Sequence, residues 1–196
     1  LIEGKLRERG LDRMVKLNVQ AFGDAVDFGD IKVEFIKTNH SIQDAAALAI
    51  FTPAGTIIHT GDFKVDYTPV FGDPIDLQRF AELGKEGVLA MMSDSTNATK
   101  PGSTMSERTV GGTFERIFAE HQQNRIIVAT FASNVDRVQQ IINTAAKYKR
   151  KVVVEGRSMV NVITVASELH YIDIPEGTLI SIDELKSYPD EQTVLI

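Results

Sequence analysis

The sequence predicts a mixed α/β fold, and two patterns carry this prediction. In the first hundred residues apolar and charged positions alternate, as in Ile31, Val33 and Phe35, which is typical of half-buried strands. Beyond about residue 75, apolar strands alternate with helices, which favours a parallel sheet with helices on its faces. The 196 residues suit one large domain or two small ones, and the change of pattern favours parts of two domains joined near residues 97–102.

The first half is expected to form an antiparallel or mixed sheet that follows a short helix over residues 1–9. Strands are predicted over residues 14–20, 31–37, 45–51 and 56–60, with turns at 27–30 and 52–55. The run over residues 45–51 is apolar and short enough for a buried strand, although its alanines leave a helix possible.

The second half is expected to alternate helices and strands. Helices are predicted over residues 75–83, 105–121, 134–149 and 159–170, with a short one after 181, and strands over 87–92, 125–131, 151–155 and 192–196. Thr104 with Glu107, and Ser181 with Glu184, have the spacing of a capping box. Ser133 is predicted to be the N-cap of its helix.

Composition excludes several classes of protein and site. Apolar residues make up 43% and charged residues 24%, which argues against a disordered chain or a coiled coil. The absence of cysteine excludes disulfides, thiol nucleophiles and cysteine-bearing zinc sites, so any metal must bind His, Asp or Glu. A formal charge of −6 does not indicate a basic nucleic-acid binder. No apolar run approaches the roughly 18 residues of a membrane span.

The two ends of the sequence resemble cut points. The chain starts with Leu1 rather than Met and ends on an apolar run, whereas natural termini tend to be polar. We interpret it as a segment of a longer chain, with a processed natural terminus as the alternative. The charged start is also unlike a secretory signal.

Polar clusters follow two predicted strands of the first half. Residues 38–41 read Thr-Asn-His-Ser, and residues 59–64 read His-Thr-Gly-Asp-Phe-Lys. If both strands end at one sheet edge, His40 and Asp62 can converge on one metal ion. Taken alone, a loop histidine is usually solvated or hydrogen-bonded, and an aspartate after a glycine is usually a turn former.

Three further polar clusters, at residues 93–97, 130–134 and 155–158, follow strands of the second pattern. Ligands of parallel sheets bind at the carboxyl ends of the strands. Hydroxyl groups and helix N-termini suit phosphate, and Arg157 could add a bidentate contact. Ser133 acting only as a helix cap is the alternative, but the repetition at three strand ends favours a phosphorylated ligand.

The remaining candidates point to structure rather than chemistry. His121 and His170 lie at predicted helix C-termini, where an imidazole interacts favourably with the helix dipole. The basic run over residues 147–151 could touch a nucleic-acid backbone, but such a run is more often a solvated helix end.

Taken together and in order, these motifs resemble the ribonuclease J family, the bacterial metallo-β-lactamase nucleases that carry a β-CASP domain. The segments concerned are TNHSI at 38–42, IHTGDFK at 58–64, GVL at 87–89, SDSTN at 93–97, PG at 101–102 with SE at 106–107, TFASN at 130–134 with RVQ at 137–139, and GRSM at 156–159. Each motif alone is weak, and their order carries the resemblance.

The resemblance implies part of a metallo-β-lactamase αββα sandwich over residues 1–97, followed by most of a Rossmann-like, parallel-sheet β-CASP domain over 98–196. It also implies that His40 binds zinc, that Asp62 bridges two zinc ions, and that Asp94 orients a ligand or the attacking water. Asp62 and Asp94 are thus the expected catalytic residues. Ser133, Asn134, Arg157 and Ser158 are the side chains expected to contact RNA or phosphate.

The function implied by the resemblance is that of a cytoplasmic, zinc-dependent ribonuclease in RNA processing, including rRNA processing, and decay. Family members cleave RNA internally and from a 5′-monophosphate end, and a homodimer, a tetramer or a heteromer of paralogues is implied. No membrane partner is expected. The alternatives are a superfamily hydrolase of a small ester or thioester, against which the clusters at 93–97 and 130–134 argue, and a non-catalytic paralogue, against which His40 and Asp62 argue.

The sequence departs from the family pattern in one respect that bears on activity. The family's His-x-His-x-Asp-His, Gly-His-Ala and His-Gly-Glu segments, which supply metal and phosphate contacts, do not occur in residues 1–196. His40 and Asp62 alone would leave zinc under-coordinated. We therefore expect residues 1–196 by themselves to bind zinc weakly or not at all and to be inactive.

Overall fold

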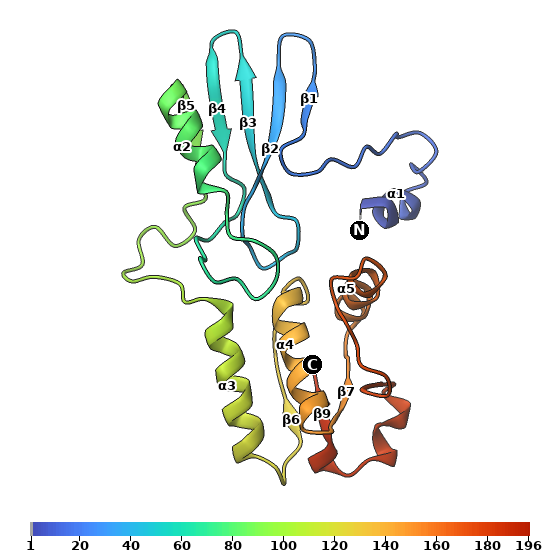
Figure 1. The fold of residues 1–196 in the computed structure, drawn as a ribbon. Helices are drawn as coiled ribbons and strands as arrows, with labels where there is room; N and C mark the ends of the chain where they lie inside the picture. The colour runs from blue at the N-terminus through green and yellow to red at the C-terminus, as the bar shows by residue number, and fades with distance from the viewer. Residues whose placement is uncertain (1) are drawn as a thin grey trace. The chain divides into compact units, whose positions relative to one another are not determined.

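The computed structural model describes residues 2–196, which divide into two compact units (Figure 1). The first unit comprises the residues up to His40 together with Asp44–Tyr67 and Asp73–Thr104. The second comprises Met105–Ile196 and two short loop segments, Ser41–Gln43 and Thr68–Gly72. These two loops belong to the second unit by their contacts, although their neighbours in the sequence belong to the first.

The first unit contains a five-stranded sheet in the order β1-β2-β3-β4-β5. Its strands are β1 (Ala25–Asp27), β2 (Lys32–Lys37), β3 (Ala46–Thr52), β4 (Gly55–His59) and β5 (Ala90–Met92). Neighbours from β1 to β4 pair antiparallel, whereas β4 and β5 pair parallel. Because β2 and β4 are both antiparallel to β3, the strands β2, β4 and β5 all end at the same edge of the sheet.

A small apolar core and one ion pair hold helix α2 (Leu77–Glu86) in the first unit. Leu83 of α2 is fully buried and shares a core with four residues of the sheet, Ile36, Ala47, Ala49 and Ile58. At the helix start, the Asp76 side chain accepts a hydrogen bond from the Arg79 backbone N–H. The Arg79 guanidinium then donates to both carboxylate oxygens of Glu34, over 2.7 and 2.9 Å, which fixes α2 to strand β2.

The second unit contains a four-stranded parallel sheet in the order β6-β9-β7-β8. Its elements are α3 (Glu107–Glu120), β6 (Ile126–Ile127), α4 (Val135–Lys147), β7 (Lys151–Val153), α5 (Arg157–Glu168), β8 (Leu179–Ile180), the 3-10 helices η1 (Asp183–Ser187) and η2 (Asp190–Gln192), and β9 (Thr193–Leu195). Phe118, Ile141 and Val152 are fully buried in a core that takes residues from all three helices. The predicted α/β architecture with a parallel sheet is therefore confirmed.

The predicted strand over residues 14–20 is wrong. The structure has helix α1 (Ile2–Glu8) near the start of the chain, in agreement with the prediction except for Leu1, which lies outside the described residues, and then an irregular segment up to β1. Met14 and Val19 are largely exposed. Alternation in this segment does not build a strand because residues 25–27, rather than 14–20, pair with β2.

Two predicted helix caps are also wrong. Ser106, not Thr104, caps α3, because the Glu107 carboxylate that would complete the capping box pairs instead with Arg137, over 2.8 Å. Asn134, not Ser133, caps α4, and its side chain accepts from the Arg137 backbone N–H. Both replacements satisfy the free N–H groups of a helix start.

The box at residues 181–184 does form one of its two hydrogen bonds. Glu184 accepts from the backbone N–H of Ser181 over 2.9 Å and from its hydroxyl over 2.8 Å. These two hydrogen bonds lower the pKa of the Glu184 carboxyl, the backbone one contributing most. These bonds join Ser181 to the first turn of η1, whose N-cap is Ile182.

The basic run over residues 147–151 contains both exposed and packed cations: Lys147 and Lys149 are exposed, as expected for a solvated helix end, whereas Arg150 is buried. Arg150 donates to the carbonyls of His121 and Asn124 over 2.7 Å each, and lies over the Phe118 ring. Lys147 pairs with Glu115 over 2.7 Å. Arg150 and Lys147 thus join the end of α4 to α3 and the loop after it. Between residues 2 and 196, no helix has the length and apolar composition needed to cross a membrane.

Candidate functional site

Three polar loops meet at one edge of the first unit's sheet. They are residues 38–40 after β2, residues 60–64 after β4, and residues 93–97 after β5. The antiparallel and parallel pairings of the sheet bring these three strand ends to the same side. The prediction that His40 and Asp62 converge required their two strands to end at the same edge of the sheet, and the structure meets this condition.

His40 and Asp62 face each other across this edge. The His40 Nε2 atom lies 3.7 Å from Asp62 Oδ2, and the two side chains are 36% and 75% exposed. Behind them, the backbone N–H of Lys64 donates to the Asn39 carbonyl over 2.8 Å. The pair is thus open to an incoming ligand while the loops that carry it are joined by a backbone hydrogen bond.

Gly61 makes the turn that presents Asp62. Its φ of 61° is in the left-handed region, and a Cβ at this position would lie 3.1 Å from the Ala46 carbonyl oxygen. Its backbone N–H donates to His59 Nδ1 over 3.1 Å. Only glycine combines this backbone conformation with so close an approach to β3, which explains the Gly-Asp sequence after the strand.

Asp94 is held by hydrogen bonds on both its backbone and its side chain. Its N–H donates to the Thr60 hydroxyl over 3.0 Å, and its carboxylate accepts from the N–H and the hydroxyl of Thr96, over 2.9 and 2.7 Å. The Thr96 backbone N–H, followed by its hydroxyl, lowers the pKa of the Asp94 carboxyl, and the N–H of Phe63 and the charge of His40 act in the same direction. Asp94 is accordingly a carboxylate fixed in place near His40.

A pocket of about 310 Å³ lies beside these loops. Its lining consists of Phe63, Lys64, Val65, residues 94–98, Ser103 and Thr104. Lys64 is held by Asp66, with 3.3 Å between Nζ and Oδ2, and Asp66 is buried. The pocket therefore combines hydroxyl and amide groups with one cation, Lys64, and one carboxylate, Asp94, a lining suited to a polar ligand.

The residues present fit part of a metal site. His40 and Asp62 are an imidazole and a carboxylate, and their 3.7 Å separation is close to the roughly 3.3 Å expected for two ligands about 2.0 Å from one tetrahedral zinc ion. Within residues 2–196, however, no group of three or more His, Asp and Glu side chains is arranged to hold a metal. A closed zinc site needs four ligands, so further ligands would have to come from outside these residues.

The strand-end clusters of the second unit have different surroundings. Asn134 is buried and its side chain caps α4 over a 3.1 Å hydrogen bond, while Ser133 before it is partly buried. Arg157 and Ser158 are exposed in the first turn of α5, whose N-cap Gly156 has a φ of 88° and provides no side-chain cap. Arg157 and Ser158 can thus reach a ligand, whereas the Asn134 side chain already has a structural partner.

The other two histidines lie at helix ends, as expected. His121 is the C-cap of α3, and its backbone N–H donates to the Ile117 carbonyl. His170 follows α5 with a φ of 60°, a left-handed conformation typical of the residue after a helix.

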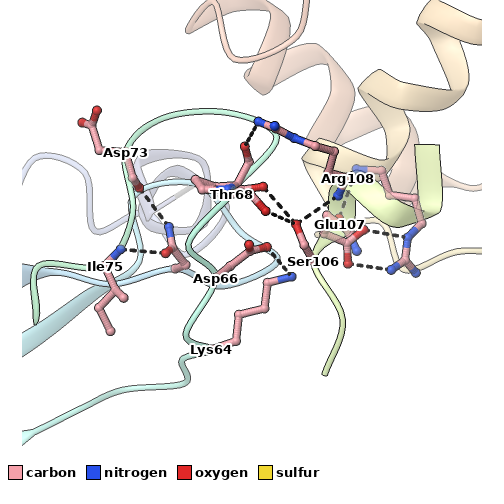
Figure 2. A network of polar contacts seen from close by, with 12 residues as sticks. Lys64, Asp66, Thr68, Asp73, Ile75, Ser106, Glu107 and Arg108 are labelled. Carbon is pink, nitrogen blue, oxygen red and sulfur yellow. Dashed lines mark hydrogen bonds and ion pairs between the residues drawn. The ribbon is translucent and has the colours of Figure 1, made fainter. Parts of the chain in front are cut away.

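Three contacts within the second unit carry no sequence signal. The Gln43 amide donates to Asp136, which is 93 positions away in the sequence. The Ser106 hydroxyl donates to the Thr68 carbonyl over 2.9 Å, and Arg108 reaches the carbonyl of Pro69 (Figure 2). The loops that directly follow His40 and Tyr67 are therefore held at the N-terminal ends of α4 and α3. Local pattern cannot reveal pairs so far apart in the chain.

The family model and the curated relatives that match this chain both carry the name ribonuclease J. Residues 123–196 match the family described as ribonuclease J, beta-CASP domain. Over the whole length of this chain, it is 43% identical to the ribonuclease J of Synechocystis and 47% identical to ribonuclease J 1 of Streptococcus pyogenes. Over 87% of this chain, it is 47% identical to the ribonuclease J of Helicobacter pylori strain J99.

The matches cover only part of each relative. The chain spans 31%, 35% and 25% of those three proteins, respectively. A crystal structure of an Enterococcus faecalis protein of unknown function matches 92% of the chain and 45% of that protein, with a TM-score of 0.66 at 20% identity, and this likeness concerns the fold alone. Residues 123–196 therefore match the β-CASP domain of the ribonuclease J family, and the chain as a whole is similar to a segment of proteins named ribonuclease J.

Proposed function

We propose that these residues are part of a metal-dependent ribonuclease and that the strand-end edge of the first unit supplies a share of its catalytic centre. The observation that carries the proposal is the exposed His40 and Asp62 pair, 3.7 Å apart, beside a pocket with Asp94 on its wall. Imidazole and carboxylate ligands suit metal-assisted hydrolysis of a phosphodiester. The 38–47% identity to proteins named as ribonucleases J supports the choice of RNA as substrate.

Zinc is the proposed metal, as two ions in the full-length protein, with His40 and Asp62 among its ligands. When bound, such ions lower the pKa of a water molecule and neutralise charge on the phosphodiester. The geometry of His40 and Asp62 supports a shared ion, and the further ligands are proposed to lie outside residues 1–196. For that reason we propose that residues 1–196 alone bind zinc weakly or not at all and are inactive.

The proposed roles of the chain's own side chains follow from their surroundings. The hydrogen bonds from Thr96 fix the Asp94 carboxylate and lower its pKa, so it can orient a ligand or the attacking water. Lys64 provides a cation on the pocket wall for a phosphate group. Exposed Arg157 and Ser158 are proposed to contact the RNA backbone together with Ser133 and Asn134, although the side chain of Asn134 also caps α4.

The proposed assignment of the two halves follows the same reasoning. Residues 1–97 are proposed to be the C-terminal part of a metallo-β-lactamase segment and residues 98–196 most of a β-CASP domain, supported by the family match over residues 123–196. The proposed substrate is RNA with a 5′-monophosphate end, cleaved internally and from that end, in cytoplasmic RNA processing and decay. A homodimer, tetramer or heteromer of paralogues is the proposed assembly.

The test of this function compares the full-length protein with residues 1–196 alone. Each is titrated with zinc in a calorimeter and incubated with RNA that carries a labelled 5′-monophosphate. We expect turnover by the full-length protein only, and a loss of more than about 100-fold in its His40→Ala and Asp62→Asn variants. Turnover by residues 1–196 at the full-length rate, or full activity of both variants, would contradict the proposal.

A further inference from the structure

Asn39, directly before His40, is hydrogen-bonded to two other segments of the first unit. Its side-chain amide donates to the Asp73 carbonyl over 3.1 Å and accepts from the Ile75 backbone N–H over 2.7 Å (Figure 2, where Asp73 and Ile75 are labelled). Its backbone carbonyl accepts from the Lys64 N–H over 2.8 Å, and the two residues form an isolated antiparallel bridge. One residue thus joins the loop of His40 to two other loops.

The chemistry of these contacts requires an amide side chain. The turn at residues 73–75 presents a carbonyl at Asp73 and an N–H at Ile75, while Pro74 between them has no N–H. An asparagine offers one acceptor and a donor on the same short side chain, and here it uses both. An aspartate keeps the acceptor, loses the donor and places a charge against the Asp73 carbonyl. An alanine loses both hydrogen bonds.

The position of Asn39 relates these bonds to the candidate site. The residue after it is His40, and its bridge partner Lys64 lies two positions after Asp62. A displacement of Asn39 would therefore move His40 relative to Asp62, whose facing atoms are 3.7 Å apart. Partners of metal-binding side chains commonly act in this way, by fixing the orientation of the ligand and not by touching the metal.

We infer that Asn39 is a positioning residue, which sets the relative placement of His40 and Asp62 through its hydrogen bonds to Asp73, Ile75 and Lys64. This inference rests on the proposed function, because it takes His40 and Asp62 to be the working pair. The competing explanation is a merely structural role, in which Asn39 serves only to start helix α2, because the turn at 73–75 leads into Asp76, which caps that helix.

The test uses the full-length protein with Asn39→Ala and Asn39→Asp, and with Asp73→Asn as the matched control. The control keeps the Asp73 carbonyl that Asn39 binds and removes only the surface ion pair of Asp73 with Lys37. Four quantities are measured: turnover of 5′-phosphorylated RNA, RNA affinity after chelation of the metal, zinc affinity by competition with a chelator, and amide hydrogen exchange at Ile75 and Lys64.

For Asn39→Ala we expect a 10- to 100-fold loss of both turnover and zinc affinity, which is the range for residues that orient metal ligands. The affinity for RNA should stay within about 2-fold, and exchange at Ile75 and Lys64 should accelerate. Asn39→Asp should lose less than Asn39→Ala, because it keeps the acceptor for the Ile75 N–H. Asp73→Asn should behave as the unmodified protein.

Three results would overturn the inference. One is faster exchange at Ile75 with unchanged turnover and zinc affinity, which would show a structural role only. Another is a loss of turnover that merely follows the folded fraction in both Asn39 variants. The third is equal losses in Asp73→Asn and Asn39→Asp. If His40→Ala and Asp62→Asn were themselves fully active, the proposed function would fail; if those two are inactive while both Asn39 variants are active, only the positioning role fails.

Discussion

The two sheets of this protein use the polar residues at their strand ends differently. In the first unit, His40 and Asp62 extend outward from loops that are fixed by backbone hydrogen bonds. In the second unit, Asn134 follows a strand in the same way, yet it is buried and its side chain caps α4. The position of a polar residue after a strand therefore does not by itself separate an exposed candidate ligand from a helix cap.

The cores of the two units differ as well. The buried cluster of the second unit includes Phe118, Ile141 and Val152 and draws on three helices and the sheet, whereas the cluster of the first unit around Leu83 is much smaller. The second unit thus has a large apolar core to which α4 contributes many residues, whereas the first unit has a small core beneath the strands whose loops carry His40 and Asp62. The following predictions test this contrast, from the largest expected effect to the smallest.

Phe118→Ala should have the largest effect, because it removes a fully buried ring at the centre of the larger core. We expect a loss of about 3–5 kcal/mol in the free energy of unfolding. Amide hydrogen exchange should report the loss first in β7 and β9. His40→Ala in the first unit should change the free energy of unfolding by no more than about 0.5 kcal/mol. Equal losses in the two variants would contradict the contrast.

Gly61→Ala should destabilise more than Gly177→Ala. Both glycines have positive φ, 61° and 70°, but a Cβ at Gly61 meets the Ala46 carbonyl oxygen at 3.1 Å, while at Gly177 it meets only the end of the Lys151 side chain at 3.7 Å. We expect about 1–2 kcal/mol for Gly177→Ala from backbone strain alone and a larger loss for Gly61→Ala. Thermal melting measures both, and the reverse order would show that the turn before Asp62 is not tightly packed.

The variants Asn134→Ala and Ser133→Ala test which of the two residues caps α4. Removal of the Asn134 cap should cost about 1 kcal/mol, and Asn134→Ser should restore much of it. Ser133→Ala should leave the melting temperature nearly unchanged, because Ser133 is not the cap. Urea denaturation gives the stabilities. A clear destabilisation by Ser133→Ala alone would return the capping role to Ser133.

Arg157→Ala should have the smallest effect on stability, within about 0.5 kcal/mol, because the side chain is exposed. If Arg157 contacts an RNA phosphate, the slope of log affinity against log salt should fall in magnitude by about 0.7. Binding of single-stranded RNA by the full-length protein at several salt concentrations measures this slope. Arg116→Ala, on the exposed face of α3 and paired with Glu120, is the matched control and should leave the slope unchanged.

Much of the fold can be predicted from local pattern. Period-two alternation locates β2, the Pro-Ala-Gly turn locates the β3–β4 hairpin, and the change to alternating helices and strands predicts the parallel sheet. The pattern fails where an element is too short to have a period, as in the two-residue strand β8. It also fails at residues 14–20, where alternation is present but a different segment pairs with β2.

The side chains of the candidate site can be predicted from the sequence, whereas the hydrogen bonds that hold their loops in place cannot. His40, Asp62 and Asp94 belong to motifs next to strand ends, so the sequence alone identifies them as candidates. Asn39 lies in the same motif, but its partners at Asp73 and Ile75 are 34 and 36 positions away. Serine and asparagine are both favoured as N-caps, so residue type alone does not decide between Ser133 and Asn134. The choice depends on where the backbone becomes helical.

The two loops at Ser41–Gln43 and Thr68–Gly72 have a consequence for how the protein is made. Both are synthesised early, yet they belong to a unit whose remaining residues begin at Met105. Gln43 cannot bond Asp136 until α4 has left the ribosome, and Thr68 must wait for Ser106. The sheet of the first unit can pair as soon as its strands emerge, but the loops that follow His40 and Tyr67 reach their final positions only afterwards. The two loops that directly follow His40 and Tyr67 are thus completed only after α3 and α4 have been synthesised.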